Sequence, residues 1–406
     1  MTSDYDAILW HQNPLARRTD FSKVSTAPFS TERVQAVRSF HRSLPSYRPT
    51  PMFSMAERAR RLGIAGLYIK DEGHRFGLKA FKVLGASYAL WRTLTRMLQD
   101  GETVVTFNGL LKPEFKKRLS ATTCITATDG NHGLAVAWSA RQLGCRAVVY
   151  LPQGTAEARL ENIRRLGAEA EIIAGDYDEA VEKAALQARR QGWLLIQDTA
   201  WSGYTEIPSR IMQGYLTMFD EALEQLGDPA PTHLFIQCGV GSLAAALQGF
   251  LVERYGSGRP IVVVVEPTAF ASFYRSALAG DGRPRGIESP AASLMAGLAC
   301  GEPSTIAWAI LRDYCDMFAA CPDAVTVEGM RMLARPLPGD PEIVSGESGA
   351  VTTGLVHEIL VREAYAPLKA DLGIDTHSRI LLFSTEADTD PDMYREIVTP
   401  QTPPAV

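Results

Sequence analysis

The middle of the chain alternates short β-branched runs with amphipathic stretches, and this alternation restricts the possible folds more than any other feature. After a strand expected at 103–107 ("TVVTF"), four more runs favour strands, "CITAT", "RAVVYLP", "AEIIAG" and "WLLIQD", and amphipathic stretches at 131–144, 156–169 and 177–192 separate them. Strands that alternate with helices are typical of parallel α/β units.

The same alternation restarts further along the chain. We expect one helix over 209–227, a strand at 232–238, a helix at 242–256 and a strand at 260–267. The last of these, "PIVVVVEP", is apolar from Ile261 to Val265, as is typical of a strand buried on both faces. "RILLFST" (379–385) is expected to be the last strand. The chain is therefore of the α/β class, with two separate series of strands.

Composition excludes several classes of protein. The 406 residues carry a formal charge of −5, which gives no electrostatic argument for nucleic acid or an anionic membrane. Six cysteines with no CxxC pair argue against both a disulfide framework and a zinc site, and we predict no metal. The start, "MTSDYDAILWHQN", lacks a signal-peptide pattern, and no apolar run is long enough for a bilayer. We expect a cytoplasmic protein.

One lysine stands inside an almost wholly apolar helical run, "GLKAFKVLGASYAL" (77–90). Lys82 either lays its stem on apolar surface with its ammonium in water, or is a buried Schiff-base lysine. Burial depresses the pKa of a lysine, which favours the neutral amine that attacks an aldehyde. Lys79, one turn earlier, is expected to be solvated.

The segment "TATDGNHGLAVAW" (126–138) predicts a strand, a tight turn and a helix. Backbone N–H groups in such a turn form an anion site at a helix N-terminus. Asn131 can offer its amide to a ring hydroxyl or a carboxylate. Asp129 either caps the turn, which is common, or moves a proton in catalysis.

A second strand–turn–helix segment, "IQCGVGSLAAA" (236–246), is glycine-rich. Gly239, Gly241 and Ala244 fit the G-x-G-x-x-A form, and Glu266 ends the next strand, so a nicotinamide dehydrogenase is one alternative. The turn alone predicts only a phosphate site, and the Ser242 hydroxyl suits a terminal phosphate.

Several isolated polar residues are by themselves more typical of caps and turns than of catalysis. Asp198 ends the strand "WLLIQD", where ligand sites of open α/β sheets lie. Glu347 lies in the small-residue turn "SGESGA", and Thr385 follows the last expected strand.

A lysine, a phosphate turn and an Asn-containing turn, in this order, resemble the fold type II pyridoxal-phosphate enzymes, the family of tryptophan synthase β and threonine dehydratase. "AFKVLGA", "TDGNHG" and "GVGSL" resemble that family's lysine, substrate-carboxylate and phosphate motifs. Within the family the chain is most similar to the diaminopropionate ammonia-lyases. That similarity is carried by "KDEGHRFGLKAFKVLGASYAL", "TATDGNHGLAVAW", "QDTAWSGYTEIP", "VEP", "AGLACGEPS", "SGESGA" and "STEADTDPDMYREIV". The chain departs from the family at Lys79, where a smaller Asn is usual, and at Ala387, where Gly is common.

The resemblance implies a carbon–nitrogen lyase that uses pyridoxal 5'-phosphate to convert D- or L-2,3-diaminopropionate to pyruvate and ammonia. It implies Lys82, Asp129 and Asp198 as catalytic residues. The residues implied to bind the cofactor are Phe81, Lys82, Asn131 (ring oxygen), Gly239, Val240, Gly241, Ser242, Leu243 (phosphate), Glu347 and Thr385 (ring nitrogen). The residues implied to bind the substrate are Thr128, Asp129, Gly130, His132 and Asp198.

The resemblance also implies the architecture: two open, mostly parallel sheet domains with flanking helices, in a homodimer. We expect a large cofactor-binding domain formed by 1–84 and 206–406, with a small α/β domain, 85–205, inserted in it. The alternatives are a serine/threonine dehydratase of the same family, which Asp129 and Asp198 argue against, a dehydrogenase that uses the glycine turn and Glu266, and a protein that binds the cofactor without turnover.

Overall fold

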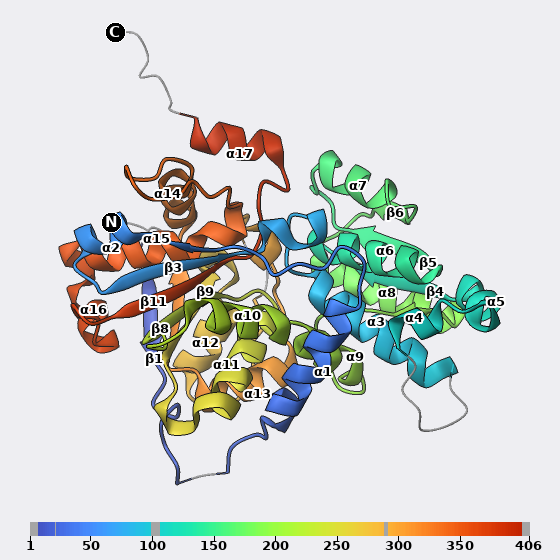
Figure 1. Ribbon diagram of the computed structural model, residues 1–406, viewed down its shortest axis with the longest axis horizontal. Helices are drawn as coiled ribbons and strands as arrows, with labels where there is room; N and C mark the ends of the chain where they lie inside the picture. The colour runs from blue at the N-terminus through green and yellow to red at the C-terminus, as the bar shows by residue number, and fades with distance from the viewer. Residues whose placement is uncertain (1–6, 21, 99–105, 288–290, 400–406) are drawn as a thin grey trace.

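The computed structural model describes residues 7–20, 22–98, 106–287 and 291–399, and these form two sheets that lie side by side along the longest axis of the molecule (Figure 1). The larger sheet has the strand order β1-β10-β9-β8-β11-β3-β2, and the smaller has the order β6-β5-β4-β7. Helices flank both sheets (Figure 1). The predicted class, two open α/β sheets, is confirmed.

The larger sheet is parallel except at its edges. Its strands are β1 (Leu9–Gln12), β2 (Met52–Ser54), β3 (Gly66–Asp71), β8 (His233–Gln237), β9 (Ile261–Pro267), β10 (Met317–Cys321) and β11 (Arg379–Ser384). The central strands are buried, which explains the uninterrupted apolar run of β9.

The smaller sheet is parallel throughout. Its strands are β4 (Thr123–Ala127), β5 (Arg146–Leu151), β6 (Glu169–Ile172) and β7 (Leu194–Leu195). Its connecting helices are α6 (Asn131–Leu143), α7 (Glu157–Arg164) and α8 (Tyr177–Gln191). All four strands fall between residues 123 and 195, inside the segment expected to form the small domain; the domain boundaries themselves stay a prediction.

The long buried helix α3 (Val83–Leu98) packs against both α6 and α9 (Glu206–Gly214), so it connects the two parts of the molecule. The remaining α-helices are α1 (Thr31–Arg42), α2 (Ala56–Leu62), α4 (Phe107–Leu110), α5 (Pro113–Ala121), α10 (Leu216–Leu226), α11 (Ser242–Tyr255), α12 (Ser272–Ala279), α13 (Thr305–Tyr314), α14 (Asp323–Ala334), α15 (Glu347–Val361), α16 (Ala366–Leu372) and α17 (Pro391–Val398).

Two of the expected elements were wrong in detail. The helix expected over 209–227 is divided into α9 and α10, and the division follows Gly214, whose missing side chain lets the backbone approach Leu84. The strand expected at 103–107 lies partly outside the described residues, and its last residue begins α4 instead. The strand expected at 379–385 is confirmed as β11.

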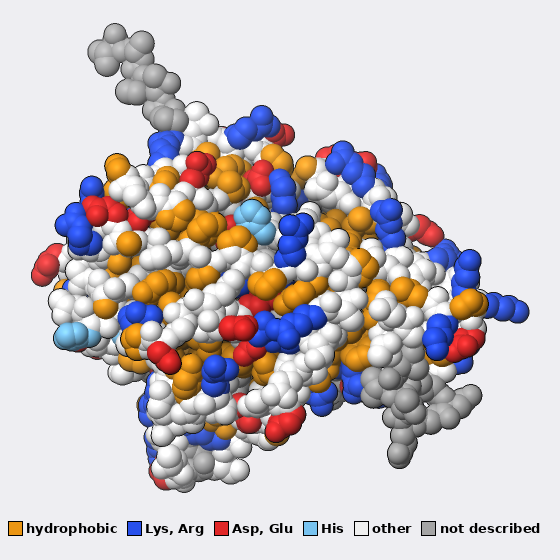
Figure 2. Space-filling view, in the orientation of Figure 1, with side chains coloured by type: hydrophobic (Ala, Val, Ile, Leu, Met, Phe, Trp, Pro, Cys, Tyr) orange, Lys and Arg blue, Asp and Glu red, His pale blue; other side chains and the backbone are white. Residues whose placement is uncertain are grey.

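The surface gives no sign of a large charged area on the face shown in Figure 2, where Lys, Arg, Asp and Glu side chains are interspersed with apolar ones. A duplex-binding surface needs clustered positive charge, and that face does not present it. Within the described ranges, none of the helices is long and apolar enough to cross a membrane.

Candidate active site

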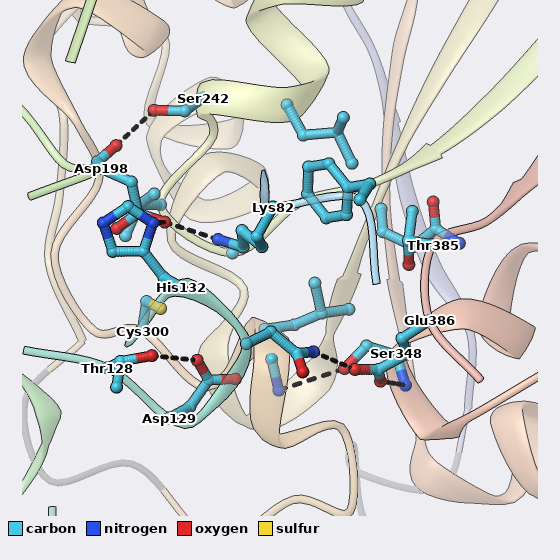
Figure 3. Close-up of a pocket in the computed structure, with 18 of the residues that line it drawn as sticks. Lys82, Thr128, Asp129, His132, Asp198, Ser242, Cys300, Ser348, Thr385 and Glu386 are labelled. Atoms are coloured by element: carbon cyan, nitrogen blue, oxygen red, sulfur yellow. Dashed lines mark hydrogen bonds and ion pairs between the residues drawn. The ribbon is translucent and has the colours of Figure 1, made fainter. Parts of the chain in front are cut away.

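One cavity lies where the carboxyl ends of β4, β8 and β11 meet the first turns of α3 and α11 (Figure 3). Ligand sites of open α/β sheets lie at this edge. The cavity is lined by Phe81, Lys82, Thr128, Asp129, Asn131, His132, Tyr177, Asp198, Gln237, Gly239, Val240, Gly241, Ser242, Leu243, Gly297, Leu298, Cys300, Ser348, Thr385 and Glu386. Both sheets therefore contribute to one site.

Lys82 and Asp198 form an ion pair inside this cavity. The Lys82 Nζ donates to the Asp198 Oδ2 at 2.5 Å, and the carboxylate is nearly inaccessible to solvent. Tyr177 donates its hydroxyl to the other carboxylate oxygen at 3.3 Å. The lysine and the carboxylate expected to be catalytic are thus in direct contact, although 116 residues separate them in the chain.

This ion pair overturns the expectation that burial depresses the pKa of Lys82. Burial is the largest single effect and acts in that direction, but the charges of Asp198 and Asp129 and the hydrogen bond to Asp198 together outweigh it, and the pKa of the Lys82 ammonium is raised above its usual range. Burial likewise acts to raise the pKa of Asp198, but the charge and hydrogen bond of Lys82, together with His132 and Tyr177, outweigh it, and this pKa is lowered. In the chain alone, Lys82 is a paired ammonium rather than a free amine.

The segment that leads to Lys82 has an irregular backbone. The φ angles of Phe76, Gly77 and Lys79 are 51°, 71° and 59°. Side chains disfavour this left-handed conformation, so the surrounding structure must stabilise the segment. The Lys79 side chain is half exposed and pairs with Asp388 at 2.7 Å, which confirms that it is solvated.

A cluster of four charges, Lys70, Glu72, Arg75 and Glu221, lies beneath this segment, and we call it the buried charge cluster. Each member is at most 1% exposed. Arg75 donates to Glu72 at 2.8 Å and to Glu221 at 2.7 Å, and Lys70 donates to Glu221 at 2.9 Å. Two positive and two negative charges offset one another, and the cluster anchors the segment just before Lys82.

Asp129 presents a free carboxylate oxygen to the cavity. Its Oδ1 accepts from the Thr128 hydroxyl at 3.4 Å, whereas Oδ2 is buried and has no hydrogen-bond partner among the described residues. A buried carboxylate oxygen normally has a donor, so this one is placed to receive a proton or an ammonium from a bound molecule.

His132, beside it, is fixed as a neutral donor. Its Nε2 lies 2.7 Å from the Ile196 carbonyl oxygen, which can only accept, so Nε2 carries the hydrogen. Burial lowers the pKa of the imidazole, and Nδ1 lies 3.9 Å from the Asp198 carboxylate. His132 therefore lines the cavity next to the Lys82–Asp198 pair without a hydrogen bond to it.

Asn131 begins α6 and is joined to the far side of the cavity. Its Nδ2 donates to the Oε2 of Glu386, which follows β11 (Figure 3). Gly130, just before it, has a φ angle of 144°, and a Cβ at this glycine would lie 3.0 Å from the Arg159 side chain. The turn needs glycine at this position. Gly130 does not line the cavity, but the turn that it allows brings Asn131 there.

The glycine-rich turn Gly239–Gly241 and the start of α11 form the opposite wall. The first N–H groups of a helix have no partner within it and favour an anion. A Cβ at Gly241, whose φ angle is 95°, would lie 2.3 Å from the Phe273 ring. The Ser242 hydroxyl, expected to donate to a phosphate, instead donates to the Asp198 carbonyl oxygen at 2.6 Å, where a buried acceptor requires a donor.

Glu266 has a structural role that removes the dehydrogenase alternative. It is fully buried, and its two carboxylate oxygens accept from the backbone N–H groups of Phe273 at 2.9 Å and Tyr274 at 2.7 Å. Both oxygens are therefore bonded to the start of α12, and neither is available to a ribose.

Two predicted site residues, Gly130 and Glu347, do not line the cavity, whereas Thr385 does. Ser348, the neighbour of Glu347, lies there instead. Burial and the charge of Glu386 raise the pKa of Glu347 to about 7. Sequence reasoning missed Tyr177, which has no motif around it, and Cys300, which lies in the family-like block "AGLACGEPS".

The residues present fit pyridoxal phosphate. A lysine can reach an aldehyde, and the turn at α11 is a phosphate cradle whose glycines leave room: a Cβ at Gly239 would lie 3.1 Å from Leu298 Cα. The unpartnered Asp129 oxygen and the Asn131 amide add polar groups for a substrate and a ring. Across the described chain, no group of three or more His, Cys, Asp or Glu side chains could hold a metal ion.

Comparison with known proteins agrees with this arrangement. Residues 44–358 match the family model of pyridoxal-phosphate dependent enzymes. The chain is 47% identical to the diaminopropionate ammonia-lyase of Salmonella typhimurium over 366 residues, which cover 89% of this chain and 91% of that protein. It is 41% identical to the Escherichia coli enzyme over 381 residues, or 93% of this chain and 94% of that one.

Solved structures give the same result. A crystal structure of the Escherichia coli diaminopropionate ammonia-lyase, in complex with an aminoacrylate–PLP azomethine reaction intermediate, superimposes with a TM-score of 0.86 at 38% identity, over 97% of both chains. A tomato threonine deaminase at 19% identity shares only the fold, with a TM-score of 0.67. The chain belongs to the diaminopropionate ammonia-lyases, within the family of pyridoxal-phosphate dependent enzymes.

Proposed function

We propose that this chain is a pyridoxal-phosphate dependent carbon–nitrogen lyase that converts 2,3-diaminopropionate and water to pyruvate and two ammonia molecules. The observation that carries the proposal is the pair of carboxylates, Asp198 at 2.5 Å from Lys82 and Asp129 with an unpartnered oxygen, in one cavity with a phosphate cradle. The relatives described above bear the name of this activity.

The chain's own residues hold the cofactor in place. Lys82 would hold its aldehyde carbon, the turn 239–243 would hold its phosphate, Asn131 would donate to its ring oxygen, and Thr385 would serve its ring nitrogen. When bound, the cofactor would supply an electron sink for the negative charge that develops at the substrate Cα. A neutral threonine hydroxyl, unlike an aspartate, would not fix a proton on the ring nitrogen, which would favour elimination over transamination.

Two bases serve the proton at Cα. Lys82 Nζ takes it from one enantiomer. The free oxygen of Asp129, on the opposite face of the substrate Cα, takes it from the other enantiomer. Positioned bases of this kind contribute roughly 10²- to 10⁴-fold to rate. An enzyme with both bases accepts D- and L-substrates.

Selectivity against serine comes from charge. Diaminopropionate carries a second ammonium where serine has a hydroxyl, and Asp129 and Asp198 supply carboxylates for it. A hydrogen bond between charged groups contributes roughly 1.5–3 kcal/mol, which corresponds to about 10- to 100-fold discrimination. The protonated β-amino group of diaminopropionate leaves as neutral ammonia, whereas the hydroxyl group of serine would have to leave as hydroxide.

We further propose a cytoplasmic homodimer that acts on a small amino acid and binds neither nucleic acid nor a membrane. The charge of −5 and the mixed charges of the face in Figure 2 support the part of this proposal that concerns nucleic acid and membranes. Light scattering of the purified protein tests the dimer.

The experiment is pyruvate and ammonia release from the purified holoenzyme with L- and D-diaminopropionate, and with L-serine and L-threonine in parallel. We expect diaminopropionate to be turned over at least tenfold faster than serine, and Asp129→Asn to lose one enantiomer selectively. Equal or faster turnover of serine or threonine would mean that the dehydratase alternative is right and the aspartates only shape the turn.

A further inference from the structure

Glu386 joins the two sides of the cavity through both of its carboxylate oxygens. It is 2% exposed and lies two residues after the end of β11. Its Oε1 accepts from the backbone N–H of Ser348 at 2.9 Å, and its Oε2 accepts from the Asn131 side-chain amide. Neither the sequence motifs nor the mechanism above gives this residue a role.

The contact determines which end of the Asn131 amide faces Glu386. An ionised carboxylate only accepts hydrogen bonds, whereas the amide has an accepting oxygen and an NH2 group with two hydrogens. The NH2 group must therefore face Glu386 with one hydrogen. The other hydrogen stays available to the cavity, which Asn131 also lines.

We propose that Glu386 is a positioning residue that aims the second amide hydrogen of Asn131 at the ring oxygen of bound pyridoxal phosphate and so keeps that oxygen ionised. The inference rests on the proposed function only for the identity of the cofactor. It does not depend on which amino acid is the substrate.

The charges around Glu386 come from several elements. Arg159 of α7 and Glu347 of α15 both interact electrostatically with it, and Asp129 and Asp390 interact with the same arginine. Arg159 is itself 8% exposed and donates to the Asp129 carbonyl oxygen at 3.3 Å. One buried cation thus lies among these carboxylates.

Because Glu386 is charged, positioning and plain electrostatics predict opposite results. If only its negative charge mattered, removing that charge would make the ring oxygen easier to ionise, and the apparent pKa of the bound cofactor would fall. If Glu386 acts through Asn131, its removal lets the amide turn, the ring oxygen loses a donor, and the apparent pKa rises.

The decisive variant is Glu386→Gln, studied as the holoenzyme. Ser348 and Asn131 donate to different oxygens of Glu386, and glutamine replaces one of these oxygens with an NH2 group that can only donate, so one of the two contacts is lost. The readout is a pH titration of the visible absorbance of the bound cofactor, without substrate. We expect its apparent pKa to rise by about one unit, which is a tenfold loss of ionisation. A fall, or no change, would overturn the proposal.

A double-mutant cycle separates action through Asn131 from a direct effect. Asn131→Ala should raise the apparent pKa by itself, and Glu386→Gln should add no further rise in that background. Two additive rises would mean that Glu386 does not act through Asn131. The matched control is Asp390→Asn, because Asp390 caps α17 through Met393 and does not contact Asn131, and Asn is an equally good cap. We expect no shift in the control.

Cofactor binding gives a second readout. The phosphate turn and Lys82 are unaltered in Glu386→Gln, so the folded variant, verified by its thermal unfolding, should stay yellow with a cofactor Kd raised less than about tenfold. A folded but colourless variant would contradict a purely positioning role. If the titration behaves as expected but diaminopropionate is not turned over, this inference stands and the proposed substrate is wrong.

Discussion

Replacing Asp198 by asparagine tests the ion pair on which the site is built. Asn keeps the shape of the side chain and can still contact Tyr177, but it removes the charge that lies 2.5 Å from Lys82 Nζ. An opposite charge at this range raises the pKa of a lysine by roughly 1–3 units, and burial of Lys82 acts in the other direction. Without the Asp198 charge, the burial of Lys82 is opposed less strongly, and the pKa of its ammonium falls.

The sign of the effect follows from the chemistry of the amine. Only the neutral amine attacks the cofactor aldehyde, so a raised pKa keeps Lys82 inactive below it. In Asp198→Asn we therefore expect the pH midpoint for cofactor capture by the apoprotein to move down by roughly 1–3 units. Turnover of diaminopropionate should nevertheless fall by roughly 10- to 100-fold, because the substrate ammonium loses a charged hydrogen-bond acceptor.

The assay is stopped-flow absorbance of the apoprotein mixed with pyridoxal phosphate between pH 6 and the highest pH at which it stays folded. Tyr177→Phe is the matched control, since it removes a contact to Asp198 and keeps the charge, and its midpoint should move much less. A midpoint in Asp198→Asn that stays in place or moves up would refute the argument that Asp198 controls the charge of Lys82.

Three further predictions concern stability and cofactor retention. The pKa of Glu347 is raised to about 7, above its value in the unfolded chain. Between about pH 4.5 and 7 the folded apoprotein therefore binds more protons than the unfolded chain, and it loses stability as the pH rises. Urea unfolding should show Glu347→Gln more stable than the parent by about 1–3 kcal/mol at pH 8 and little changed near pH 4.5. Gly241→Ala should weaken cofactor binding at least tenfold in a dialysis assay, because its Cβ would lie 2.3 Å from Phe273 at a φ angle of 95°; retention equal to the parent's would contradict the tight turn. Lys79→Asn should change the free energy of unfolding by less than about 1 kcal/mol, since Asn suits the φ angle of 59° and the lost ion pair with Asp388 is exposed; a larger loss would show that this ion pair matters.

Much of the fold was predictable because the strands have a local signature. The β-branched runs of β4, β5, β8 and β9 are bounded by turn residues, and each was placed within a residue or two. The edge strands β1 and β2 have only four and three residues with no alternation, so no local pattern marks them. The break between α9 and α10 depends on packing against α3, which no local pattern shows.

The site divides in the same way. Lys82, Asn131 and the glycine turn stand in motifs and could be found from the sequence, and Asp198 could be found from its place at a strand end. The charge state of Lys82 could not, because it depends on a contact across 116 residues. Tyr177 enters the cavity only through packing and stands in no motif. Glu386 does lie in the block "STEADTDPDMYREIV", but its contact with Asn131 joins positions 255 residues apart, which no local pattern shows.

The buried charge cluster beneath the lysine segment has a consequence for how the cofactor is acquired. Because Arg75 and its partners are held together in the folded core, we expect the segment from Phe76 to Lys82 to be ordered before the cofactor binds. Cofactor binding therefore does not have to order this segment, and the cofactor affinity is not reduced by the conformational entropy that such ordering would cost. Conversely, a substitution at Glu221, outside the cavity, should make cofactor capture slower while leaving every cavity residue in place.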